Sequence, residues 1–127
     1  MTKSGLKLHL LTERFSVCRL APDEPVPEDL PQSSLLSITR TADELSLVCA
    51  ESDDLPGKVE SGWRGLVVDG PLEFDQVGVL ASLATPLADA GISIFVISTY
   101  DTDYLLVKEA QQEEAISCLR AAGYSIL

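Results

Sequence analysis

The sequence predicts an α+β fold in which a β-α-β-β-α-β unit follows a shorter, strand-rich segment. Apolar and polar residues alternate along much of the first fifty residues, which indicates strands, whereas apolar residues recur every three or four positions over residues 76–90, which indicates a helix. A second helical pattern covers residues 111–122. The 127 residues, 46% of them apolar, are enough for one compact domain or two very small ones.

The first part of the chain contains a predicted hairpin and a predicted loop. Residues 6–11 and 15–20 alternate with period two and predict two strands that are joined by a turn at residues 12–14. Residues 21–34 carry four prolines. Because proline donates no backbone hydrogen bond and has a fixed φ, this stretch is expected to be a loop.

A second strand pair is predicted at residues 35–40 and 45–50. The acidic stretch 51–62 contains one proline and two glycines and is interpreted as a linker. We therefore expect an abbreviated unit at residues 1–61 and a complete unit at residues 62–127.

The second half of the chain begins with a clear strand and helix. A strand is predicted at residues 63–69, and a helix over residues 76–90 begins after an N-cap at Asp75 and ends at Gly91. The apolar stripe that this helix is expected to bury consists of Val79, Leu80, Leu83 and Leu87.

A hairpin, a helix and a short strand complete this half. Residues 92–99 and 103–107 predict the hairpin, residues 111–122 the helix and residues 124–127 the last strand. This order is typical of the ferredoxin-like fold, an antiparallel four-stranded sheet with both helices on one face. Apolar residues occupy both faces of strand 92–99, so we expect the N-terminal strands or a second chain to cover the face away from the helices.

The charge balance excludes several function classes. Nine basic and twenty acidic residues give a net charge of −11, distributed over both halves of the chain. A field of this sign repels nucleic-acid backbones and anionic lipids, so neither nucleic acid nor a membrane surface is an expected partner. The chain has neither a signal-peptide pattern at its start nor an apolar run of about 18 residues, and we expect a cytoplasmic protein.

No catalytic or metal-binding set is visible in the sequence. Cys18, Cys49 and Cys118 are widely and irregularly spaced, and we interpret them as buried apolar residues rather than zinc ligands. The single histidine, His9, is expected on the polar side of a strand. Gly-rich phosphate loops are absent. The sequence thus predicts a protein that is not an enzyme and that needs no metal or cofactor.

The start of the first helix is one candidate binding segment. The first N–H groups of a helix have no intrahelical partners and lie at its positive end, so residues 74–79 can hold a carboxylate. Gly78 lets a ligand approach the backbone closely. The alternative is a well-capped helix in which Gly78 allows tight packing against a strand.

The tip of the predicted hairpin is the second candidate segment. Residues 97–104 bring hydroxyl groups, an aromatic ring and carboxylates together at the end of an apolar hairpin. An ammonium group can pair with Asp103 and hydrogen-bond to Ser98 or Thr99, while Tyr100 covers an apolar stem or stacks on a guanidinium. The alternative is ordinary turn chemistry.

Taken together, the two segments are complementary to a zwitterion. A strand that follows a helix in this unit runs antiparallel to it, so residues 98–100 are expected to return towards the start of the helix. Amides for an anion and a carboxylate for a cation then lie a few ångström apart, which suits an α-amino acid.

The chain resembles small bacterial tandem ACT-domain proteins related to the animal cytosolic arginine sensors. The resemblance rests on TRTADELSLVCAE (residues 39–51), on GWRGLVVDGPLEFDQVGVLASLATPLADAGISIFVISTYDTDYLLV (residues 62–107) and on AAGYSIL (residues 121–127). The helix–glycine–strand part is more distantly similar to the regulatory domains of aspartate kinases.

This resemblance implies two ACT-like units and an amino-acid ligand at an ACT–ACT interface. Because the sensors contain more units than this chain, it also implies a homodimer. The ligand-binding positions that it implies are Val77, Gly78 and Val79 at the helix start, Ser98, Thr99 and Tyr100 at the strand end, and Asp103 after the turn.

Two other functions stay open from the sequence. A module that dimerises or binds a protein without a small ligand is suggested by the two apolar faces of strand 92–99. An enzyme has only the analogy of the fold to support it.

Overall fold

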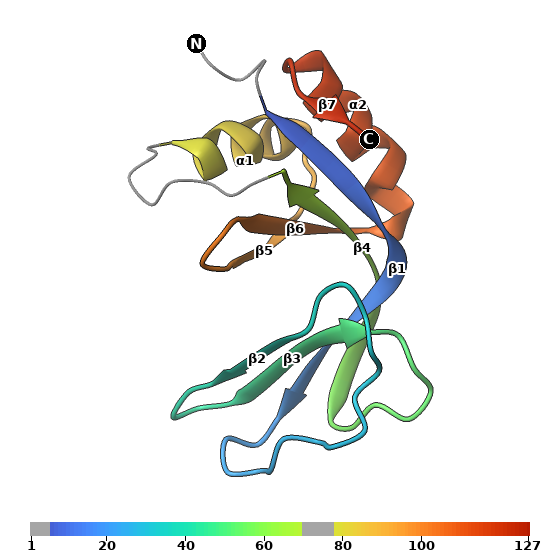
Figure 1. The fold of residues 1–127 in the computed structure, drawn as a ribbon, viewed down its shortest axis with the longest axis vertical. Helices are drawn as coiled ribbons and strands as arrows, with labels where there is room; N and C mark the ends of the chain where they lie inside the picture. Colours follow the sequence, from blue (N-terminus) through green and yellow to red (C-terminus); the bar gives the residue numbers. More distant parts are fainter. Residues whose placement is uncertain (1–5, 70–77) are drawn as a thin grey trace. The chain divides into compact units, whose positions relative to one another are not determined.

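The computed structural model describes residues 6–69 and 78–127, which form two compact units (Figure 1). The helical unit contains the described residues of 6–12 and 64–127, and the strand unit contains residues 13–63. The predicted division gives each unit one continuous stretch of the chain, residues 1–61 and residues 62–127, and it stays a prediction. The packing, by contrast, assigns the beginning of the first strand to the helical unit.

The described residues contain seven strands, two α-helices and one short 3₁₀ helix. They are β1 (Lys7–Leu20), β2 (Ser37–Arg40), β3 (Leu45–Ala50), β4 (Lys58–Val68), α1 (Val79–Asp89), β5 (Phe95–Ser98), β6 (Asp103–Lys108), η2 (Glu109–Gln111), α2 (Gln112–Ala121) and β7 (Ser125–Ile126). The order from β4 onward is the β-α-β-β-α-β order that the sequence predicts.

The helical unit is built on a sheet in which the strands lie in the order β5-β6-β4-β1-β7. The hairpin of β5 and β6 is antiparallel, whereas β1 pairs parallel to β7, with Lys7 opposite Ser125 and Leu8 opposite Ile126. The start of β1 therefore lies between β4 and β7, so the sheet has one strand more than the predicted four-stranded sheet. The α+β, ferredoxin-like prediction is confirmed with this addition.

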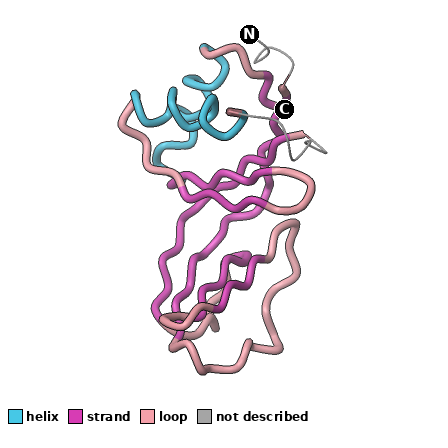
Figure 2. The backbone as a smooth tube through the Cα atoms, turned by 90° about the vertical axis from the view of Figure 1, so that its left-hand side faces the viewer, coloured by secondary structure: helices cyan, strands magenta, loops and turns pink. Residues whose placement is uncertain are grey.

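Both helices pack on one side of this sheet (Figure 2). Leu83 and Leu87 of α1, which the predicted stripe contains, are fully buried, and so is Leu119 of α2. They pack with Leu105 of β6 and Leu66 of β4 in one apolar core. Burial of such side chains contributes about 1.5–3 kcal/mol each, and the core therefore fixes the two helices on the sheet.

The predicted N-terminal hairpin is wrong. The chain does not turn at residues 12–14, and Lys7–Leu20 form the single strand β1. The reason is that residues 12–14 contain no glycine, proline or asparagine, and that the two ends of β1 pair with different strands. β1 pairs with β7 at its beginning and with β3 over Phe15–Leu20.

The strand unit has the strand order β2-β3-β1-β4 and contains no helix among residues 13–63. The pairing of β2 with β3 confirms the second predicted strand pair. One face buries Cys18, Leu20, Leu45 and Leu47. Leu30 from the Pro-rich loop and Leu55 from the loop before β4 pack on this face in the place of a helix.

The Pro-rich loop is attached to β1 by a carboxylate. The backbone N–H and the hydroxyl of Ser34 both donate to the carboxylate of Glu13, each at 2.7 Å. Both hydrogen bonds stabilise the charged carboxylate and lower the pKa of Glu13; the bond from the Ser34 hydroxyl has the larger effect and the bond from the Ser34 backbone the smaller one. The charged side chain therefore holds a loop that has no regular backbone pairing of its own.

The acidic stretch 51–62 is only partly the linker that the sequence predicts. β4 begins at Lys58, and Ser61 donates or accepts a 2.8 Å hydrogen bond with the buried Ser16 of β1. Strand β5 covers Phe95–Ser98 and is shorter than the predicted 92–99; the backbone N–H of Ile92 donates to the Leu87 carbonyl at the end of α1, at 2.9 Å. These boundaries depend on pairing partners from distant parts of the chain.

Candidate functional site

The turn between β5 and β6 holds the predicted hairpin-tip residues in one place. Ser98 lies opposite Asp103 in the strand register, and its hydroxyl donates to Asp103 Oδ1 at 2.6 Å. The backbone N–H of Thr99 donates to the Thr102 carbonyl at 2.8 Å, which closes the turn. Tyr100, in the middle of the turn, is 79% exposed. The tip thus presents a half-buried carboxylate beside a hydroxyl and an exposed ring.

A further side chain fixes this tip within the helical unit. The hydroxyl of Thr102 donates to the carbonyl oxygen of Val68, the last residue of β4, at 2.6 Å. The turn and the end of β4 are therefore held together. The sequence analysis did not single out Thr102, because its role depends on the neighbouring strand rather than on the turn.

A left-handed glycine precedes α1, and two consecutive hydrogen bonds between hydroxyl and carbonyl groups fix its first turn. Gly78 precedes the helix with a φ of 82°, in the left-handed region that favours glycine, and no heavy atom lies within 4 Å of a Cβ placed there. Ser82 donates to the Val79 carbonyl at 2.8 Å, and Tyr124 lies 2.6 Å from the Ser82 hydroxyl. Because Ser82 has a single proton, the Tyr124 hydroxyl is the donor in that bond.

Replacing Tyr124 with phenylalanine is expected to lower the free energy of unfolding by about 0.5–1.5 kcal/mol. The change removes the donor to Ser82 and leaves the buried ring in place. Urea unfolding followed by circular dichroism measures the difference. In a double-mutant cycle with Ser82→Ala, the two effects are expected to be less than additive, and strict additivity would show that the two hydroxyl groups do not interact.

The predicted ligand-binding residues fall into three groups. Ser98, Thr99, Tyr100 and Asp103 lie together at the hairpin tip. Gly78 and Val79 lie at the start of α1, which Figure 1 draws at the same end of the helical unit as the β5–β6 turn. Val77 and Asp75 lie outside the described residues. The predicted start of the helix at residue 76, after an N-cap at Asp75, is wrong, because α1 begins at Val79 and the left-handed Gly78 precedes it. The convergence of the two segments on one ligand stays a prediction.

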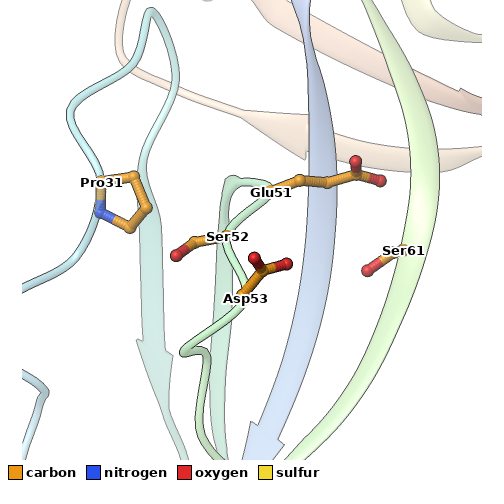
Figure 3. A pocket seen from close by; sticks show the side chains of 5 residues that line it. All are labelled: Pro31, Glu51, Ser52, Asp53 and Ser61. Atoms are coloured by element: carbon orange, nitrogen blue, oxygen red, sulfur yellow. The ribbon is translucent and has the colours of Figure 1, made fainter.

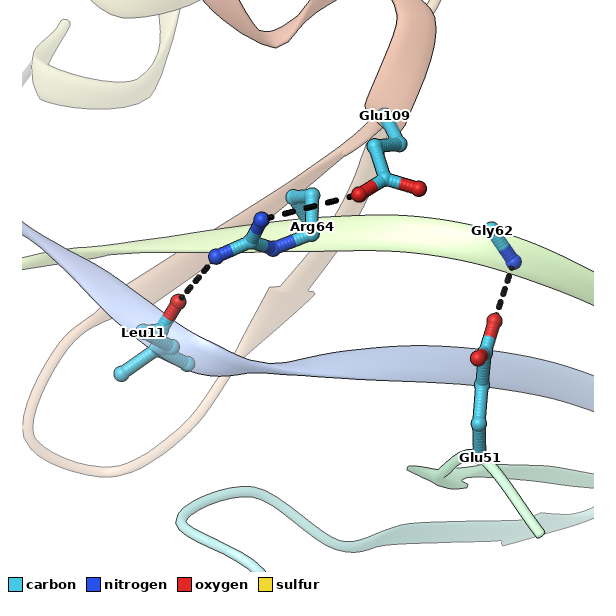
Figure 4. Close-up of polar contacts among 5 residues, drawn as sticks. All are labelled: Leu11, Glu51, Gly62, Arg64 and Glu109. Carbon is cyan, nitrogen blue, oxygen red and sulfur yellow. Dashed lines mark hydrogen bonds and ion pairs between the residues drawn. The ribbon is translucent and has the colours of Figure 1, made fainter.

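The strand unit contains a polar surface pocket that the sequence analysis missed. It has a volume of about 590 Å³ and is lined by Pro31, Glu51, Ser52, Asp53 and Ser61 (Figure 3). Glu51 is fixed there, since its Oε2 accepts the backbone N–H of Gly62 at 2.7 Å (Figure 4). The acidic composition of residues 51–62 was the only signal for it, and that composition is shared by many exposed loops.

The sequence analysis also missed the polar contacts of Arg64. Its guanidinium donates to the carbonyl oxygen of Leu11 at 3.2 Å and lies 3.9 Å from the carboxylate of Glu109 (Figure 4). The side chain is only 16% exposed. These contacts join β4, β1 and η2, so we assign Arg64 a structural role in the helical unit.

The described residues give no indication of a metal site. Over 6–69 and 78–127, no group of three or more histidine, cysteine, aspartate or glutamate side chains has an arrangement that could hold a metal ion. Nor does any helix within these ranges have the length and apolar character needed to cross a membrane.

Comparison with family models identifies the fold. The model of the ACT domain matches residues 58–121, which is half of the chain, and covers the helices and strands of the helical unit from β4 to α2. The chain belongs to the ACT-domain family. A second model, which describes an N-terminal domain, matches residues 13–58, and this range falls within the strand unit.

Similar proteins include arginine sensors and bacterial proteins of the same fold. The human cytosolic arginine sensor for mTORC1 subunit 1 is 48% identical over 48 residues, which are 37% of this chain and 15% of the sensor. A crystal structure from Agobacterium tumefaciens is 40% identical, with a TM-score of 0.87 over 96% of this chain and 92% of that one. An aspartate kinase from Clostridium acetobutylicum shares the fold at 11% identity, with a TM-score of 0.68 over 91% of this chain and 34% of the kinase.

Proposed function

We propose that this ACT protein is a non-enzymatic regulatory module that binds an amino acid at an interface between ACT units. Membership of the ACT family and the similarity to a protein named as an arginine sensor support this proposal. The observation that carries it is the hairpin tip, where the carboxylate of Asp103 is positioned by Ser98. A negative charge held beside hydroxyl groups is suited to an ammonium group.

The proposed ligand is a small zwitterion with two recognised ends. Its ammonium group pairs with Asp103, where the Ser98 bond engages Oδ1 and Oδ2 is the oxygen that we assign to the ligand. Its carboxylate accepts hydrogen bonds from the backbone at Val77, Gly78 and Val79, where the positive end of the helix dipole favours an anion. Tyr100, which is exposed in this structure, covers the side chain of the ligand.

We further propose that the protein is a homodimer and that the ligand stabilises one arrangement of the two copies. The support is β5, which lies at one end of the strand order and exposes part of Phe95, Val96 and Ile97; Ile94, just before it, is also partly exposed. An edge strand without charges or proline is a ready surface for another strand. A ligand shifts such an equilibrium only through different affinities for the two arrangements. We expect the protein to act in the cytoplasm.

A thermal-shift screen against the twenty amino acids tests the proposal. At about 100 times its dissociation constant, a ligand adds about 2.7 kcal/mol to the free energy of unfolding, which for this size corresponds to several degrees. Asp103→Asn is expected to abolish the shift and to leave the unliganded fold intact, since the amide oxygen still accepts the Ser98 bond.

Asp101→Asn is the matched control for Asp103→Asn. Asp101 is an exposed residue of the same turn, so this change removes an equal charge without touching the proposed contact. It is expected to keep the full shift. A response that survives in Asp103→Asn would remove Asp103 from the site, and the lack of a shift with all twenty amino acids would contradict amino-acid binding.

The second candidate function is a dimerisation or protein-interaction module that needs no ligand. The same half-buried apolar residues of β5 favour it. Sedimentation velocity with and without the amino acids separates the two candidates. A dimer whose dissociation constant does not respond to any of them supports the interaction module.

A further inference from the structure

Two cysteines of the strand unit are neighbours on adjacent strands. In the pairing of β1 with β3, Ser16 lies opposite Cys49, and Cys18 lies opposite Leu47. Side chains of directly opposed residues point to the same face of a sheet, and residues two positions apart in one strand share that face. Cys18 and Cys49 are therefore diagonal neighbours on one face, although 30 residues separate them in the chain.

Both side chains are enclosed by the protein. Cys18 is 1% exposed and Cys49 is 0% exposed, and both are free thiols. Burial raises the pKa of the Cys49 thiol to about 11, and the neighbouring Cys18 thiol adds to this effect. Burial likewise raises the pKa of Cys18, which the Cys49 thiol partly offsets. Each thiol thus affects the other, as expected of two groups in close approach.

The third cysteine has different surroundings. Cys118 belongs to α2 in the helical unit, where it is half-buried against the apolar core. Because it belongs to the other unit, Cys118 serves as an internal reference for the pair. Any reaction that needs two adjacent thiols is available to Cys18 and Cys49 and is unavailable to Cys118.

We propose that Cys18 and Cys49 form a dithiol site that hydrogen peroxide converts into a reversible disulfide between β1 and β3. The first thiol reduces the peroxide, taking up one oxygen atom as a sulfenic acid and releasing water. The second thiol attacks that sulfur, the S–S bond forms, and a second water leaves. Overall, the two thiols lose two protons and two electrons, and one hydrogen peroxide molecule takes them up and leaves as two waters.

The fold favours the second step over the first. Protonated, buried thiols react slowly with external reagents, so the sulfenic acid forms slowly. Once it is formed, the neighbouring thiol is held beside it, and such intramolecular reactions have very high effective concentrations. Further oxidation by a second peroxide is therefore outpaced by closure of the disulfide.

The same geometry makes the disulfide easy to reduce. Diagonal neighbours on paired strands have Cα atoms roughly 7 Å apart, which is at the upper limit for a disulfide. Closure therefore requires a small shift of β1 against β3. Strained disulfides have more oxidising potentials and are the labile ones, so mild thiol reductants are expected to reopen this bond.

The test is oxidation of the folded full-length protein by hydrogen peroxide, followed by intact mass spectrometry and peptide mapping. The experiment uses the variant Cys118→Ser, in which Cys18 and Cys49 are the remaining cysteines. We expect it to lose two hydrogen atoms, to yield a Cys18–Cys49 linked peptide and to recover its mass with dithiothreitol. Circular dichroism before and after oxidation shows whether the fold is retained.

Variants with one thiol of the pair provide the matched controls. Cys18→Ser and Cys49→Ser, each in the Cys118→Ser background, cannot close the bond and are expected to gain oxygen atoms or a sulfenic-acid trap such as dimedone. If either fails to fold, the corresponding alanine variant replaces it. Oxygen adducts without a disulfide in the paired protein, or a disulfide that forms only in urea, would overturn the proposal.

Discussion

Replacing Phe15 with alanine is expected to lower the free energy of unfolding by about 3–5 kcal/mol. Phe15 is completely buried at the point where β1 begins to pair with β3, opposite Ala50. Removing the ring loses its transfer free energy and leaves a cavity, and the small Ala50 side chain cannot fill it. Urea unfolding, followed by the fluorescence of the single, buried Trp63, measures the change.

Val17→Ala is the control for this prediction. Val17 lies on the same strand and is only half-buried, so its truncation removes fewer contacts and is expected to cost less than half as much. A loss below about 1 kcal/mol for Phe15→Ala would contradict the packing of this part of β1.

Replacing Gly57 with alanine is expected to destabilise the protein by about 2–5 kcal/mol, because two penalties combine. Gly57 has a φ of 79°, a conformation that costs an alanine about 1–2 kcal/mol. In addition, a Cβ at this position would come within 2.4 Å of the carbonyl oxygen of Arg19 and meet the Leu20 side chain at 3.1 Å. The backbone of β1 would have to move away from the loop before β4.

Gly91→Ala separates these two penalties. Gly91, after α1, has a similar φ of 75°, but no heavy atom lies within 4 Å of a Cβ built there. Its replacement is expected to cost only the conformational term, about 1–2 kcal/mol. Equal losses for the two variants in urea unfolding would show that the close approach of Arg19 to Gly57 does not occur in solution.

The proposed binding site and the dithiol site belong to different units, so their tests are independent. The amino-acid site rests on Ser98 and Asp103 in the helical unit, and the thiols lie on β1 and β3 in the strand unit. The Cys118→Ser substitution used in the oxidation experiment changes neither the residues of the amino-acid site nor the two thiols. Failure of one proposal therefore leaves the other standing.

The hairpin tip could be predicted from the sequence because its chemistry is local. Ser98 and Asp103 are five residues apart and are brought together by one turn, whose polar residues mark it in the sequence. The bond from Thr102 to Val68 spans 34 residues and depends on which strand lies beside the hairpin. No local pattern encodes that neighbour, and for this reason it was missed.

By itself, the sequence determined the order of elements from β4 to β7 and the apolar face of α1. These features follow from periodicities and end signals within ten to fifteen residues, such as Leu83 and Leu87 one turn apart and Gly91 after the helix.

Only the tertiary structure decided that β1 is one strand, that its start lies between β4 and β7, and that Cys18 meets Cys49. Strand pairing joins residues that are distant in the chain, as with Leu8 and Ile126, and alternation within a strand does not specify its partner. The hydrogen bonds and buried surface that select each partner exist only once the sheet has formed.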